Sequence, residues 1–89
     1  GQPITIKKIE QIASAEAFLA KMGIKAVRVR HHDSIARLEV DPGAFALLIE
    51  AGNRQGLINY LHGLGFTYIT LDLEGFRSGS MNAVLQGVD

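Results

Sequence analysis

The fold of this chain is decided by the stretch Lys25-Ala26-Val27-Arg28-Val29-Arg30-His31-His32-Asp33-Ser34-Ile35-Ala36-Arg37-Leu38-Glu39-Val40. Apolar and charged residues alternate over 25–30 and again over 35–40, which is the period of a half-buried strand. The polar residues 31–34 lie between the two runs and predict a hairpin turn. We therefore expect two antiparallel strands with one apolar face on a core and one charged face opposite it.

Helical patterns flank this hairpin on both sides. Before it, residues 5–22 predict a helix that has Thr5 as its N-cap and Gly23 at its end. After it, Asp41-Pro42 predicts the start of a short helix that Gly52 closes.

A third helix and a third strand follow along the chain. Asn53 is the expected N-cap of this helix, the apolar spacing continues to Leu64, and Gly65 ends the helix. Residues 67–73 predict the last strand, and Ser80 predicts the start of a brief terminal helix.

The order of these elements, α-β-β-α-α-β with a short helix at the end, predicts an α+β fold. We expect a two-layer sandwich in which a three-stranded, mostly antiparallel sheet has helices packed on one face. A right-handed crossover from the second strand to the third leaves room for the first strand between them. With that strand order, each neighbouring pair of strands is antiparallel.

Composition limits the classes of protein to which the chain can belong. The 89 residues make one small domain, and nine basic residues balance nine acidic ones, so net charge draws the chain neither to nucleic acid nor to an anionic membrane. The absence of cysteine excludes a disulfide framework and thiol chemistry within these residues. No apolar run approaches the roughly 20 residues that cross a bilayer, so we expect a cytoplasmic protein.

The charged face of the predicted sheet is the first candidate site. Period-two alternation places on it Arg28, Arg30, Arg37, Glu39, Tyr68, Thr70 and Asp72. Arginine binds phosphate and carboxylate bidentately, which lysine does not reproduce, so this face predicts a site for an anionic ligand or an acidic domain surface. Arg28 is expected near Arg37, and the alternative interpretation is a solvated lattice of ion pairs with Glu39 and Asp72.

The tail 72–82 is the second candidate site. It combines glycines and serines around Arg77, and such a loop offers backbone N–H groups, hydroxyls and one cation to an anion. The alternative interpretation is a solvated turn followed by a helix cap at Ser80. The candidate residues for binding phosphate or substrate are therefore Arg28, Arg30, Arg37, Arg77, Ser78 and Ser80.

Two further features suggest metal binding. Glu16 lies near the middle of the apolar side of the first helix, where a lone carboxylate is costly unless it is neutralised, paired or metal-bound. An internal salt bridge to an arginine, a metal ligand and a subunit contact are all open. His31 and His32 are adjacent in sequence, but no thiolate or HExxH spacing accompanies them, and His62 is interpreted as structural.

Three segments carry a family resemblance: Val27-Arg28-Val29-Arg30-His31-His32, Ala36-Arg37-Leu38-Glu39-Val40, and the tail from Gly65 to Asn82, which contains Leu73-Glu74-Gly75-Phe76-Arg77-Ser78-Gly79-Ser80. Together they resemble the C-terminal domain of the ATP-dependent sacrificial sulfur transferases (LarE type) of the PP-loop ATP pyrophosphatase superfamily. The match runs in order over nearly the whole chain, and the tail is its most specific part.

This resemblance implies a parent enzyme that adenylates a carboxylate of a pyridinium mononucleotide and inserts sulfur from its own cysteine, for nickel-pincer cofactor biosynthesis. It implies ATP and Mg in that parent, an N-terminal PP-loop domain as partner, and a homo-oligomer. It also implies substrate or phosphate contacts for Arg28 and Arg30 and a divalent metal at Glu16 and Glu39. Asp41 is the nearest candidate for a further acidic ligand.

The chain also departs from the family pattern. The SGGxDS phosphate loop and the sacrificial cysteine are absent, Asp33-Ser34 replaces a frequent Gly-Asp, and Phe76 replaces a frequent Tyr. We therefore expect residues 1–89 to be a single substrate-binding and oligomerisation domain, a fragment without the PP-loop domain, with no catalytic residue of its own. The alternatives are a stand-alone anion-binding or oligomerisation module and a small metal-binding regulatory domain.

Overall fold

The computed structural model describes residues 5–77 of the chain. Its elements are, in order, α1 (Ile6–Lys21), β1 (Val27–His32), β2 (Ile35–Val40), the 3-10 helix η1 (Pro42–Ala44), α2 (Phe45–Ile49), α3 (Ala51–Leu64) and β3 (Tyr68–Leu71). The predicted order α-β-β-α-α-β is confirmed. The terminal helix expected at Ser80 lies outside the described residues.

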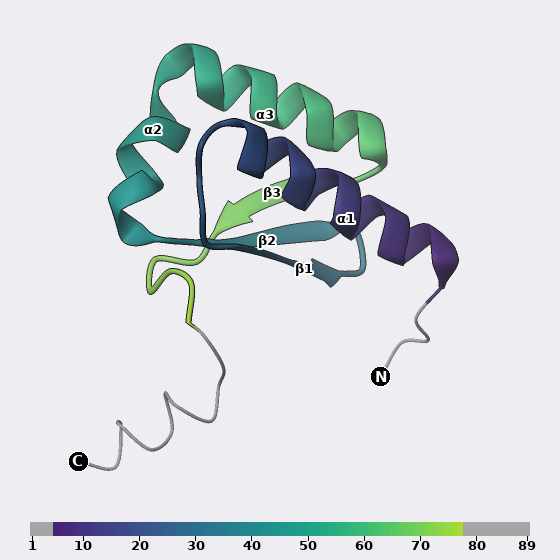
Figure 1. The fold of residues 1–89 in the computed structure, drawn as a ribbon. Coiled ribbons are helices and arrows are strands. Elements are labelled where there is room, and N and C mark those ends of the chain that lie inside the picture. The colour runs from purple at the N-terminus through teal and green to yellow at the C-terminus, as the bar shows by residue number, and fades with distance from the viewer. Residues whose placement is uncertain (1–4, 78–89) are drawn as a thin grey trace, which may run out of the picture.

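The elements form two layers. α1 and α3 lie side by side over one face of the sheet, and α1 contacts β1 while α3 contacts β3 (Figure 1). The predicted α+β sandwich with helices on one face of the sheet is confirmed. The opposite face of the sheet has no helix over it among the described residues (Figure 1).

The strand order differs from the prediction. The sheet order is β1-β2-β3, so the central strand is β2 and not β1. β1 pairs antiparallel with β2, whereas β2 pairs parallel with β3. The chain between β2 and β3 contains η1, α2 and α3, which is long enough for a helical crossover to an adjacent parallel strand. The sheet is therefore mixed, and the prediction that each neighbouring pair is antiparallel was wrong.

The hairpin is tighter than predicted. His31 and His32 belong to β1, and the turn consists of Asp33 and Ser34, with Asp33 at a φ of 54°. A two-residue loop is even-numbered, as the predicted four-residue loop was, so the residues keep their predicted faces. Arg28 lies opposite Glu39 and Arg30 lies opposite Arg37, which corrects the expected proximity of Arg28 to Arg37.

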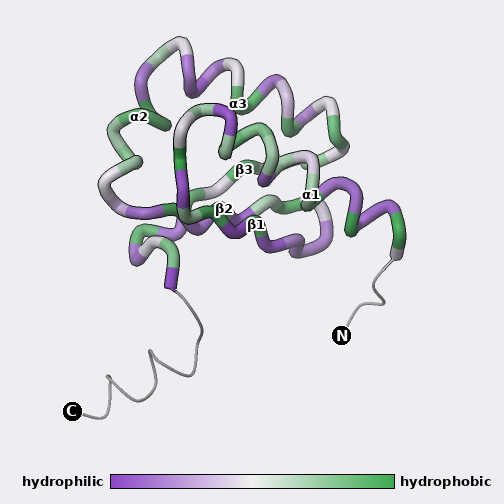
Figure 2. Tube along the Cα trace, in the orientation of Figure 1, coloured by the Kyte–Doolittle hydropathy of each residue, from purple (hydrophilic) through white to green (hydrophobic). Residues whose placement is uncertain are grey.

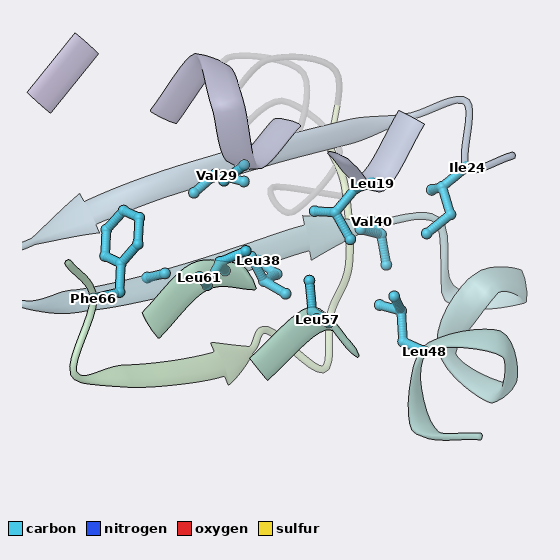
Figure 3. Packing of buried hydrophobic residues seen from close by; sticks show 11 residues of the cluster. Leu19, Ile24, Val29, Leu38, Val40, Leu48, Leu57, Leu61 and Phe66 are labelled. Atoms are coloured by element: carbon cyan, nitrogen blue, oxygen red, sulfur yellow. The ribbon is translucent and has the colours of Figure 1, made fainter. Parts of the chain in front are cut away.

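The core lies between the helices and the sheet. Leu19 of α1 and Leu61 of α3 are fully buried and meet Val29, Leu38 and Val40 from the sheet (Figure 3). Figure 2 shows polar and apolar residues alternating along both helices, which is the pattern of helices with one buried side. The last strand is shorter than the predicted 67–73: β3 ends at Leu71, and Leu73 is 80% exposed.

Local sequence signals predicted some of the helix ends correctly and others wrongly. The Thr5 hydroxyl accepts a hydrogen bond from the Lys8 N–H at 3.1 Å, as expected of an N-cap. Gly65 ends α3 with a φ of 111°. Gly52 does not close the short helix and Asn53 does not cap the third, because both lie inside α3. Within residues 5–77, no helix combines the length and the apolar character needed to cross a membrane.

The break between α2 and α3 falls at Glu50, whose backbone is extended, with a φ of −58° and a ψ of 135°. The Asn53 side chain donates a hydrogen bond to the Leu47 carbonyl at 3.0 Å. Asn53 therefore satisfies a carbonyl at the end of α2 that would otherwise lack an intrahelical partner.

Candidate functional site

The open face of the sheet, meaning the face away from the helices, carries the charged residues that alternation predicted. Arg28 lies opposite Glu39, and in the next row Arg30 lies opposite Arg37, which pairs in turn with Thr70. The neighbours that alternate with them, such as Val29 and Leu38, are buried in the core. The prediction that Arg28, Arg30 and Arg37 share one face is confirmed by this register.

Glu39 is the centre of this face. Its Oε1 lies 3.4 Å from Arg30 Nε and its Oε2 lies 3.2 Å from Arg37 Nη2. Only 7% of the Glu39 side chain is exposed, whereas the two arginine side chains are 45% and 42% exposed. One buried carboxylate therefore holds two guanidinium groups whose remaining N–H groups reach solvent, which leaves this pair of arginines with a surplus of positive charge.

Arg28 completes the row beside Glu39. It is exposed, and within residues 5–77 it takes part in no hydrogen bond or ion pair shown by the structure. The Arg37 Nε, by contrast, is buried and has no hydrogen-bond partner in the described part of the chain. Of these arginines, Arg28 is therefore the one whose guanidinium group can bind an oxyanion without first breaking an ion pair within residues 5–77.

The turn after β3 brings the tail to the same end of the sheet. The Asp72 N–H donates to the Leu38 carbonyl at 2.9 Å, so the ladder continues one residue past the strand and sets Asp72 beside Glu39. Arg77 forms ion pairs with Asp72 at 3.4 Å and with Glu74 at 2.8 Å. Arg28 and Arg77 therefore flank the same end of the sheet from its two sides, although Arg77 is neutralised by two carboxylates.

The backbone of this turn is fixed to the end of β2. The Asp72 side chain accepts a hydrogen bond from the Glu74 N–H at 2.9 Å, and the Phe76 N–H donates to the Val40 carbonyl at 2.8 Å. Gly75 has a φ of 84°, and a Cβ atom there would lie 2.7 Å from the Val40 carbonyl oxygen. Only glycine fits this position without strain.

Glu16 has a partner that the sequence did not predict. Its Oε2 accepts a hydrogen bond from the Val29 N–H at 3.0 Å. β1 is an edge strand, so this N–H points away from the sheet and would lack a partner in the ladder. The structure therefore pairs the Glu16 carboxylate with a backbone donor, and not with an arginine, which was one of the three alternatives open from the sequence.

Glu16 and Glu39 lie in different places. Glu16 reaches from the helix layer to the edge of β1, whereas Glu39 lies on the open face with both carboxylate oxygens bonded to arginines. Among the described residues, no group of three or more His, Asp or Glu side chains is arranged to hold a metal ion. A metal at Glu16 and Glu39 stays a prediction.

Gln11 and His31 form a contact that sequence reasoning missed. The Gln11 amide nitrogen donates to the Leu64 carbonyl at 2.6 Å, and its Oε1 lies 3.0 Å from His31 Nε2. Since this amide oxygen can only accept, His31 must carry its proton on Nε2 and leave Nδ1 as an acceptor. Nδ1 is buried without a partner in the described residues, and burial, followed by the charge of Lys8, lowers the pKa of His31.

A pocket opens at the end of the sheet where β1 begins and β2 ends. Its volume is about 420 Å³, and its described lining consists of Gly23, Ile24, Lys25, Ala26, Asp41, Gly43, Ala44, Leu47 and Phe76. The α1–β1 loop, the start of η1 and the tail each supply part of the wall. No motif in the sequence indicated this pocket, because its residues come from three separate segments.

Comparison with known proteins identifies the relatives of the chain. No family model matches it. It is 36% identical over 85 residues to an uncharacterized protein of Synechocystis sp., an alignment that covers 96% of this chain and 32% of that protein. It is 44% identical over 88 residues to the pyridinium-3,5-bisthiocarboxylic acid mononucleotide synthase of Lactiplantibacillus plantarum, covering 96% of this chain and 30% of that enzyme. The chain is a homologue of LarE-type proteins.

This homology confirms the LarE-type resemblance that the sequence motifs predicted. The chain spans about a third of the length of the curated relatives it matches. Of the predicted LarE-type site residues, Arg28, Arg30 and Arg37 share the open face with Glu39, and Arg77 is held at Asp72. Ser78 and Ser80 lie outside the described residues.

Proposed function

We propose that the chain is the substrate-binding part of a LarE-type, ATP-dependent sulfur transferase. In this proposal the parent protein adenylates a carboxylate of a pyridinium mononucleotide and inserts sulfur into it, for nickel-pincer cofactor biosynthesis. The Lactiplantibacillus relative is a synthase of a pyridinium bisthiocarboxylic acid mononucleotide, which supports this reaction class. The open face of the sheet supplies the contact to the phosphate.

The observation that carries the proposal is the charge balance of the open face. Glu39 is the carboxylate that holds both Arg30 and Arg37, and Arg28 has no ion pair among residues 5–77. Asp72, the other acid of this face, is occupied by Arg77. Two or three guanidinium groups are therefore available to one phosphate, which is the fork geometry that favours arginine over lysine.

The remaining chemistry is assigned to the rest of the parent protein. The chain has no cysteine, so the sulfur donor, the ATP and the Mg ion belong in this proposal to an N-terminal PP-loop domain. The coding sequence upstream of Gly1 tests this division directly. An SGGxDS motif followed by a cysteine near the junction is expected, and an upstream region without the motif favours the stand-alone binding module.

Assembly into a homo-oligomer is the second part of the proposal. Ile6 and Ile9 of α1 are 76% and 54% exposed, and Ala13, Ala17 and Ala20 continue the same exposed apolar stripe at helical spacing. Exposed apolar stripes of this kind mark protein contacts. A second copy of the chain is the proposed partner.

Isothermal titration calorimetry of the full chain with nicotinic acid mononucleotide and with pyrophosphate tests the phosphate contact. Arg28→Ala is expected to raise the Kd for both ligands about tenfold, the equivalent of about 1.4 kcal/mol. Arg54→Ala, which removes an exposed arginine from the helix layer, is the matched control and should leave both values within twofold. If the wild-type chain binds neither ligand, or if both variants behave alike, the open face is not a phosphate site.

A further inference from the structure

The pocket of about 420 Å³ lies next to the end of the open face. Ala26 and Asp41 line the pocket, and they are joined by a hydrogen bond from the Asp41 N–H to the Ala26 carbonyl at 3.3 Å. They come directly before β1 and directly after β2, next to the last pair of the ladder, Val27 and Val40. Residues two apart in an extended chain lie about 7 Å apart, so Arg28 is close to the pocket, although it does not line it.

The pocket walls suit a flat ring. Ile24, Ala44 and Leu47 supply apolar surface, and Phe76 supplies an aromatic ring. Pockets for small ligands are mostly apolar, carry a few charged groups and measure roughly 300–1,000 Å³. An aromatic wall also favours a cationic ring through the negative face of its π system.

Lys25 and Asp41 are the charged residues in the described lining of the pocket, and they have opposite signs. Asp41 precedes η1, but its side chain makes no capping hydrogen bond to that helix. The Asp41 carboxylate is therefore not engaged by the backbone N–H groups at the start of η1. A pyridinium ring that bears a carboxylate is itself zwitterionic, so Asp41 matches the ring nitrogen and Lys25 matches the carboxylate.

We infer that this pocket binds the pyridinium ring of the mononucleotide whose phosphate the open face binds. The inference rests on the proposed function, since it names the part of the same ligand that lies beyond the phosphate. Arg28 stands between the two subsites, so one ligand reaches both of them. The pocket then determines specificity for the ring, and the arginines bind the phosphate whatever ring accompanies it.

Three probes separate the two subsites by calorimetry on the full chain: nicotinic acid mononucleotide, ribose 5-phosphate, which lacks the ring, and pyrophosphate. Ala44→Leu fills the pocket and is expected to raise the Kd of the mononucleotide at least tenfold, while the other two ligands stay within twofold. Ala46→Leu makes the same change at an exposed position of α2 that does not line the pocket, and it should bind all three ligands as the wild type does.

A second variant keeps the test decisive if Ala44→Leu proves misfolded by circular dichroism. Asp41→Asn is nearly isosteric and should weaken the mononucleotide about fivefold, with ribose 5-phosphate unchanged. The ring subsite is overturned if a folded Ala44→Leu variant binds the mononucleotide as the wild type does. If only Asp41→Asn folds, unchanged mononucleotide binding by that variant overturns it. If Arg28→Ala still weakens all three ligands in that case, the proposed function survives, whereas no effect of Arg28→Ala on any ligand removes the proposed function itself.

Discussion

Glu39 shows how one side chain serves both stability and binding. The residue is only 5% exposed, and its carboxylate bridges Arg30 and Arg37. Without it, two like charges would face each other directly across adjacent strands, which is destabilising. The same carboxylate also competes with any external anion for the two guanidinium groups. Stability and anion affinity are therefore opposed at this residue.

Glu39→Gln is expected to lower the free energy of unfolding by about 1.5–3 kcal/mol, the range for hydrogen bonds to charged groups. The half-exposed arginines recover part of their hydration, so we expect the lower end of this range. The variant should at the same time bind pyrophosphate more tightly, because the Glu39 carboxylate no longer competes with the ligand for the Arg30 and Arg37 guanidinium groups. Urea denaturation and calorimetry measure the two effects. Glu10→Gln, at an exposed position of α1, should change neither, and weaker binding by Glu39→Gln would contradict this account.

His31 links the helix layer to β1 and should make stability depend on pH. Its pKa is lowered by burial and by the charges of Lys8 and His32, against a raising effect of Asp33. The unfolded chain therefore binds a proton at this residue more readily than the folded chain. The stability contributed by neutral His31 is complete above pH of about 6.5 and is lost as the pH falls below that value.

We expect the melting temperature to decrease as the pH is lowered from 7 to 5, and the decrease to be smaller in His31→Gln. His62→Gln, which alters an exposed histidine of α3, should keep the wild-type slope. Differential scanning calorimetry at four or five pH values gives both slopes. Equal slopes in the wild type and in His31→Gln would show that this histidine is not the titrating group.

At the scale of elements, the turn after β3 is attached firmly to the end of β2. The Gly75 Cα faces the Val40 carbonyl and the Pro42 ring, with an ideal Cβ 2.9 Å from Pro42 Cδ. The Phe76 N–H bonds to the same carbonyl. This contact positions both Phe76, which lines the pocket, and Arg77, which flanks the open face.

Gly75→Ala is expected to destabilise the fold by about 2–4 kcal/mol, because a left-handed backbone costs about 1–2 kcal/mol for an L-residue and the clash with backbone adds to it. Gly56→Ala is the matched control. Gly56 lies within α3 and a Cβ there meets nothing within 4 Å, so alanine should stabilise by about 0.5–1 kcal/mol. Chemical denaturation of both variants measures the difference, and two effects of the same sign would contradict the assigned backbone geometry.

Local patterns predicted the elements better than their arrangement. Alternation over 25–40 predicted the hairpin and its charged face, and Thr5 and Gly65 marked helix ends, because these signals depend on neighbouring residues. The central position of β2 depends on how the crossover through α3 packs, which no local pattern encodes. Likewise, the partner of Glu16 is a backbone N–H 13 residues away, so the helix pattern revealed an unusual carboxylate but not what satisfies it.

At the scale of the whole molecule, the two layers leave distinct surfaces for distinct tasks. The helix layer, which includes α1, covers one face of the sheet, and the opposite face is charged (Figure 1). The exposed Ile6 and Ile9 therefore belong to the helix layer, whereas the arginines belong to the sheet face without helices. Assembly through α1 would leave the open face accessible to ligand.

Ile9→Glu is therefore expected to shift the chain toward the monomer without weakening pyrophosphate binding. A charge introduced into an apolar contact is costly to bury, while the folded monomer, in which Ile9 is 54% exposed, tolerates it. Sedimentation equilibrium measures the mass, and Ala46→Leu, at an exposed position of α2, serves as the control. A wild-type chain that is monomeric at all concentrations would refute assembly through this stripe.

The bond between Glu16 and the Val29 N–H has one more consequence. An edge strand whose amides lack hydrogen-bond partners can pair with a strand of another molecule, which leads to aggregation. The Glu16 carboxylate occupies one such amide of β1 and brings a negative charge to the border, so strand-to-strand fusion is disfavoured on that side. Any extension of the sheet by another polypeptide is thereby directed to the opposite border, along β3.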